Sequence, residues 1–103
     1  MKRSTEITAT DIANWKQQYG TIAKLVAEED GEKKVSFVRT PTNKEIDFAS
    51  VNLTKGSLTQ YGIALYNTCF IGGEKFTSEK ALRTAGKHMN EMIEEAEMQF
   101  EKL

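Results

Sequence analysis

The fold is decided by residues 21–40, TIAKLVAEEDGEKKVSFVRT. Apolar and polar residues alternate over 21–28 and again over 34–40, which is the period of a β-strand with one buried face. Between the two runs lies Asp30-Gly31, and an Asp-Gly step is a strong short-range signal for a β-hairpin. We expect the connecting loop to be longer than these two residues. The centre of the fold is therefore predicted to be an antiparallel hairpin.

A short helix, capped by Thr10 or Thr8, is predicted before the hairpin, over residues 11–19. Ile12, Trp15 and Tyr19 recur at helical spacing, so they share one face of this helix. Gly20 is the expected left-handed residue that ends it.

Two helices are predicted directly after the hairpin. Thr40 and Pro41 have the pattern of an N-cap and a first helical position, which opens a helix over 41–51. The next helix, over 58–70, follows a capping box that extends from Ser57 to Gln60. Because the helix over 58–70 is apolar on all sides, we expect it to be the most buried one.

The last helix is predicted to be capped by Thr77 or Ser78 and to run to the C-terminus, after a helix end and turn at Gly72-Gly73. Its apolar residues have heptad spacing, which is typical of a helix that packs along one seam. The seam consists of Leu82, Ala85, Met89, Met92, Ala96 and Leu103.

These elements predict an α+β fold with a short N-terminal helix, a β-hairpin and three further helices, of which the C-terminal one is long and amphipathic. The 103 residues are enough for one domain. Residues 1–9 carry no periodic pattern and are expected to form a flexible arm, so that the compact domain comprises residues 10–103. Its core is expected to contain Trp15, Phe37, Tyr61, Leu65 and Cys69. Phe48 and Val51 are among the apolar residues of the second helix, and Phe48 is at a position compatible with the core.

Composition and motifs point away from catalysis. The 14 basic and 15 acidic residues give a net charge of -1, which argues against a nucleic-acid or membrane-surface binder. Cys69, the only cysteine, lies in the most apolar helix, away from the only histidine, His88, so no nucleophile and base are paired. His88 and Glu91 share a helix face that is typical of a solvated surface. We therefore predict no catalytic, cofactor-binding or metal-ligating residues, no cofactor and no small-molecule substrate.

Three stretches resemble a family of small proteins encoded by tailed phages and prophages: Trp15-Lys16-Gln17-Gln18-Tyr19-Gly20, Val38-Arg39-Thr40-Pro41, and the run from Asn67 to Glu74. The resemblance spans residues 11–103. Phe70 stands where the family often has tryptophan, and Thr68 separates Asn67 from Cys69. Proteins of this family are similar to tail assembly chaperones.

The resemblance implies a non-enzymatic role in phage morphogenesis, in which the protein binds the tape-measure or tail-tube protein in the host cytoplasm. The alternative is a structural component that stays in the virion as a connector, minor tail or capsid-associated subunit. Neither role implies a nucleic-acid or membrane partner.

Apolar residues near the C-terminus predict where a partner binds. Met98 lies about 200° around the helix from Ala96, so it cannot share the heptad seam. Phe100 and Leu103 lie close to the chain end, beyond the expected edge of the domain. We predict that the segment from Ile93 to Leu103 contacts another copy of the chain or a helix of a larger assembly protein. The partner-binding residues are predicted to be Ile93, Met98, Phe100 and Leu103.

Overall fold

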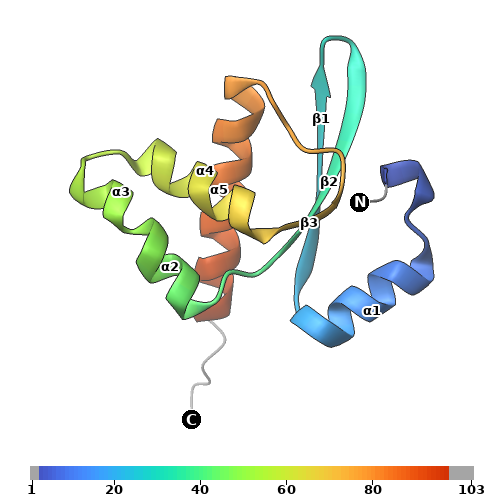
Figure 1. Cartoon of the computed structure of the whole chain (residues 1–103), viewed down its shortest axis with the longest axis horizontal. Helices are drawn as coiled ribbons and strands as arrows, with labels where there is room; N and C mark the ends of the chain where they lie inside the picture. The colour runs from blue at the N-terminus through green and yellow to red at the C-terminus, as the bar shows by residue number, and fades with distance from the viewer. Residues whose placement is uncertain (1–2, 98–103) are drawn as a thin grey trace.

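The structure is a computed structural model that describes residues 3–97. It confirms the α+β class, with a three-stranded antiparallel sheet and helices on both of its faces (Figure 1). No helix in the described range is long and apolar enough to cross a bilayer. The elements are the 3-10 helix η1 (Ser4–Glu6), α1 (Ala9–Tyr19), β1 (Ile22–Glu29), β2 (Glu32–Arg39), α2 (Asn43–Ala49), α3 (Val51–Thr54), α4 (Leu58–Cys69), β3 (Phe70–Gly73) and α5 (Glu79–Glu97).

The hairpin of β1 and β2 is present, but its turn is tighter than predicted. Pairing continues to the last residues of the two strands, where Glu29 lies opposite Glu32. Only Asp30 and Gly31 remain for the turn, and both have positive φ, 54° and 74°. Positive φ at both positions matches the twist of the flanking strands, and Asp-Gly adopts it at low cost. The expectation of a longer loop is therefore wrong.

A third strand, β3, occupies the segment that the sequence pattern assigns to the end of a helix and a turn. It pairs antiparallel with β2, so the strand order is β1-β2-β3. Its two glycines are required by close approach: a Cβ at Gly73, where φ is +87°, would lie 2.2 Å from the Val35 carbonyl oxygen. A Cβ at Gly72 would lie 2.7 Å from the Trp15 ring. The Gly-Gly pair thus lets a short strand lie tightly against its neighbours.

The helix after the hairpin begins two residues later than predicted. Thr42, not Thr40, is the N-cap: its side chain accepts from Glu45 N at 3.2 Å, while the Glu45 carboxylate accepts from Thr42 N at 2.9 Å. This capping box satisfies two backbone donors, whereas Pro41 at the first position would satisfy none. α2 ends at Ala49, and the chain continues through Ser50 into the single-turn helix α3.

The N-terminal segment differs from the flexible arm expected over residues 1–9. Ser4–Glu6 forms a 3-10 helix, and both the backbone N–H and the hydroxyl of Ser4 donate to the Glu74 carboxylate. Thr8 caps α1 through a capping box with Asp11. Polar side chains rather than apolar periodicity hold this segment, so hydrophobic patterning does not reveal it.

The core lies between the sheet and the helix pair of α4 and α5. These two helices pack closely at Gly62 and Gly86, where a Cβ on Gly62 would lie 2.8 Å from Gly86 Cα. Leu65 and Met89 are fully buried. Alternation along β1 turns Ala23, Leu25 and Ala27 toward this helix layer. The expected burial of four core residues is confirmed for Phe37, Tyr61, Leu65 and Cys69.

Trp15 differs from those four because it is only half-buried. α1 packs on the opposite face of the sheet, where the Trp15 ring lies 5.6 Å from the Phe37 ring, centroid to centroid. The sheet therefore has a thick helical layer on one face and a single helix over part of the other.

Candidate functional site

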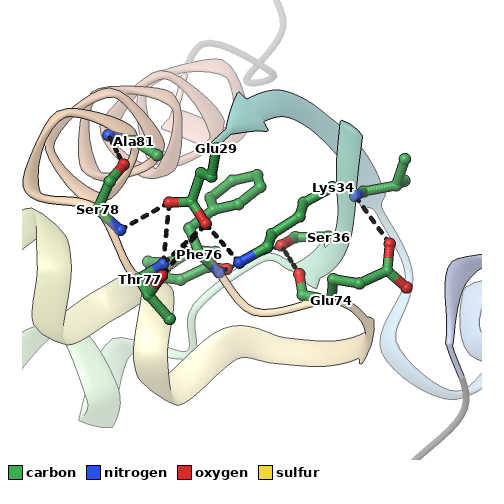
Figure 2. Close-up of polar contacts among 10 residues, drawn as sticks. Glu29, Lys34, Ser36, Glu74, Phe76, Thr77, Ser78 and Ala81 are labelled. Carbon is green, nitrogen blue, oxygen red and sulfur yellow. Dashed lines mark hydrogen bonds and ion pairs between the residues drawn. The ribbon is translucent and has the colours of Figure 1, made fainter. Parts of the chain in front are cut away.

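A buried carboxylate joins the end of β1 to the start of α5. Glu29 is 4% exposed and accepts hydrogen bonds from Thr77 N at 3.0 Å and from Ser78 N at 2.6 Å (Figure 2). Lys34 Nζ, on the neighbouring strand, lies 2.8 Å from the same carboxylate. Because the first N–H groups of a helix have no partner within it, a carboxylate from another element stabilises its N-terminus. Glu29 thus clamps α5 to the hairpin.

The electrostatics of Glu29 fit a structural role. The hydrogen-bonded Lys34 ammonium lowers the pKa of Glu29 from 4.5 to about 2, against the opposing effect of burial, with the Ser78 and Thr77 donors adding to the decrease. A carboxylate with so low a pKa is a poor general base near neutral pH. Its oxygens are already engaged by donors from two segments of the chain.

A second set of hydrogen bonds, around Tyr66, involves the segment just before the residues that bind Glu29. The Ser36 hydroxyl donates to the Glu74 carbonyl oxygen, and the Tyr66 hydroxyl lies 2.8 Å from Ser36 Oγ. Since the Ser36 proton is used on Glu74, Tyr66 donates to Ser36, and it accepts from Phe76 N at 2.9 Å. The Tyr66 and Phe76 rings stack with their centroids 5.5 Å apart. The network fixes the segment between β3 and α5 against the sheet.

Cys69 lies at the end of α4 beside an ion pair. Arg39 donates two hydrogen bonds to the Glu45 carboxylate, both at 2.7 Å, and its Nη1 also lies 3.8 Å from Cys69 Sγ. Burial raises the pKa of Cys69 to about 12, which outweighs the opposing effect of Arg39. The thiol is fully buried. This arrangement supports a structural cysteine.

Cys69 should therefore react slowly with a thiol reagent in the folded protein and rapidly after unfolding in urea. The attacking species is the thiolate, which both burial and the raised pKa disfavour. Cys69→Val should change the free energy of unfolding by about 1 to 2 kcal/mol. Rapid stoichiometric labelling of the native protein would contradict the structural role.

A groove of about 590 Å³ runs between β1 and α5. Apolar side chains of both elements line it, among them Leu25, Ala85 and Met92. Its rim on α5 carries polar residues, and His88 Nδ1 lies 3.1 Å from Glu91 Oε2 there. Within residues 3–97 no three His, Cys, Asp or Glu side chains are placed to share a metal ion. The groove is therefore a surface for apolar contact with a polar border.

Of the four predicted partner-binding residues, the structure describes only Ile93. Ile93 is half-buried and packs against the domain's own core. Met98, Phe100 and Leu103 lie outside the described residues. The heptad seam faces inward where it is described, since Ala85 and Met89 are buried. α5 thus contributes to the core from Ala81 to Ile93.

Exposed apolar side chains are concentrated instead on the short helices α2 and α3 and on the first residue of α4. Four of the six large hydrophobic side chains that are exposed within the described residues come from residues 48–58. We call this surface the α2–α3 patch; it consists of Phe48 (84% exposed), Leu58 (63%), Val51 (53%) and Leu53 (43%).

The expectation that Phe48 lies at a core-compatible position is therefore wrong. Ile46 and Ala49, three residues apart, are the α2 side chains that face the core. Phe48 lies about 200° around the helix from Ile46, so it must point away. That spacing is visible in the sequence and is the signal that identifies the patch.

No family model matches the chain, and neither a curated protein nor a solved structure is significantly similar to it.

Proposed function

We propose that the protein is a non-enzymatic binding protein of the tail-assembly-chaperone kind, which binds an apolar segment of the tape-measure or tail-tube protein in the host cytoplasm. The observation that carries the proposal is the α2–α3 patch. Phe48 exposes 84% of its surface, although the same small domain buries Tyr66 fully and leaves only 4% of Phe76 exposed. An exposed cluster of large apolar residues on a small domain is typical of a protein interaction site.

The architecture supports the same role. α2, α3 and the start of α4, which carry the patch, lie at one end of the molecule, away from the hairpin (Figure 1). α2 and α3 are held by their contacts with α4, so the apolar side chains stand on a fixed surface. A partner helix with apolar residues at helical spacing suits such a surface. The phage-specific part of the proposal comes from the resemblance of residues 11–103.

Phe48→Ser should abolish co-purification with a phage tape-measure protein when the two proteins are co-expressed. The side chain is a large exposed anchor, and truncating such an anchor often costs more than 2 kcal/mol of binding free energy. The stability of the isolated protein should change by less than about 0.5 kcal/mol, because little is buried at this position. Binding is measured by co-purification, and stability by urea unfolding.

Asp47→Ser is the matched control, since it alters an exposed neighbouring position on α2 without removing an apolar group. Unchanged binding by Phe48→Ser would contradict the patch as the binding surface. A genome without a tape-measure gene near this one would contradict the tail-assembly role. Persistence of the protein in purified virions would favour the alternative, a structural component of the particle.

A further inference from the structure

β1 is an edge strand of the described sheet. The strand order is β1-β2-β3, so within the described part of the chain β1 has a strand on one side only. The strand is eight residues long, and Val26 near its centre is 53% exposed. A long edge with an exposed apolar residue is a template for pairing with another strand.

We propose that β1 pairs antiparallel with β1 of a second copy of this chain, with Val26 beside the two-fold axis. Lys24, Val26 and Glu28 share one face of the sheet, because the residues between them turn toward the helix layer. In a pair centred on Val26, Lys24 lies directly opposite Glu28 of the second copy, and symmetry repeats this contact. Two cross-strand ion pairs then flank a contact between two valines.

The middle of α5 lies at the same height along β1 as the proposed two-fold axis at Val26. Ser78 N donates to Glu29, so α5 begins beside the end of β1, and the residues lining the groove show that it then runs back along the strand. The three residues from Glu29 to Val26 span about 10 Å of strand. Seven residues of helix also rise about 10 Å, so Ala85 lies level with Val26.

The rim of the groove is self-complementary about this level. It carries Lys80, Thr84, His88 and Glu91. Lys80 lies five residues before Ala85 and Glu91 lies six residues after it. The two-fold axis therefore brings Lys80 of each copy toward Glu91 of the other, and the second copy covers the apolar lining of the groove. The charged pairs on β1 (Lys24 and Glu28) and on α5 (Lys80 and Glu91) are thus both arranged about the level of Val26.

Charges on an edge strand can instead prevent pairing, and an edge lysine is a common means. A protective edge repels an approaching copy by presenting charge of the same sign. Here Lys24 and Glu28 lie at equal distances from Val26 and have opposite signs. An antiparallel copy therefore meets attraction at both positions, which favours self-association over protection.

The test is the dissociation constant of the dimer, measured by sedimentation equilibrium of the full chain. Lys24→Glu replaces two attractive contacts with two repulsive ones, which should weaken the dimer about tenfold to a hundredfold. Glu28→Lys should weaken it in the same way. Lys24→Glu is the primary variant because Lys24 faces Phe37 in its own sheet, whereas Glu28 faces Lys33. Circular dichroism checks that each variant is folded.

Mixing the two single variants gives the decisive result. One variant is acidic at both positions and the other is basic at both, so an antiparallel pair of the two has two attractive contacts. We expect the mixture to form a heterodimer with an affinity near that of the wild-type dimer, although the homodimer of each variant alone is weakened about tenfold to a hundredfold. General damage to the fold cannot produce this recovery.

Lys55→Glu is the control for net charge, since Lys55 is exposed and follows α3, on the other side of the molecule from β1 (Figure 1). It should leave the dimer unchanged. A wild-type protein that stays monomeric at all concentrations would overturn the proposal. This holds even if β1 then pairs with a strand of a different protein. A dimer that survives both reversals, or a mixture that fails to associate, would also overturn it.

Discussion

Glu29→Ala should lower the free energy of unfolding by about 3 kcal/mol near neutral pH. The substitution leaves the Thr77 and Ser78 N–H groups at the start of α5 without their acceptor, and it leaves the Lys34 ammonium without its partner. The Lys34 side chain is 20% exposed, so water recovers part of the loss, and the effect stays at the lower end of that for a broken buried ion pair. Urea unfolding followed by circular dichroism measures the change.

Two further variants separate the parts of this effect. Glu29→Gln keeps one oxygen acceptor for the helix N-terminus but removes the charge, so its loss should be smaller. Glu32→Ala, at an exposed carboxylate across the same turn, should change stability by less than about 0.5 kcal/mol. An unfolding midpoint for Glu29→Ala equal to that of the wild type would show that the clamp contributes nothing.

The contribution of Glu29 should also depend on pH with a definite sign. Its pKa falls from 4.5 to about 2 on folding, because the folded state stabilises the charged form. The stabilisation is therefore fully present above pH 4.5 and is lost as the pH falls toward 2. The difference in unfolding free energy between the wild type and Glu29→Ala should shrink across this window. A difference that stays constant from pH 6 to pH 2 would contradict the lowered pKa.

Elements that depend on local chemistry could be predicted from the sequence. The Asp-Gly turn, the Gly20 helix end and the Ser57 cap each require particular residues at fixed positions, and each is present. The α+β class followed from the change between periods of two and of 3.6 residues. The expected burial of Leu65 and Cys69 is confirmed because both lie in a helix that is apolar on all sides.

Features that depend on contacts distant in the sequence could not be predicted. β3 is only four residues long and contains two glycines, so it lacks strand periodicity and exists because β2 offers an edge. The clamp joins Glu29 to Thr77 and Ser78, which lie 48 and 49 residues further along the chain. No local pattern marks one glutamate in a charged turn as buried. The exposure of Phe48 is different, because its position about 200° around α2 from Ile46 follows from the sequence alone.

Leu65→Ala should destabilise the protein by about 2 to 5 kcal/mol. The side chain is fully buried in α4, where the sheet and α5 both pack against that helix. Truncation removes the free energy of burial and leaves a cavity that the close contact of Gly62 and Gly86 prevents the helices from closing.

Leu58→Ala tests whether this loss comes from burial rather than from a change of residue type in α4. Leu58 is also a leucine of α4 but is 63% exposed, so its replacement by alanine should change stability by less than about 0.5 kcal/mol. Reversible urea unfolding of the two variants side by side measures the contrast. A loss below about 1 kcal/mol for Leu65→Ala would mean that α4 is not the centre of the core, and α5 would then have to carry the packing that holds the sheet.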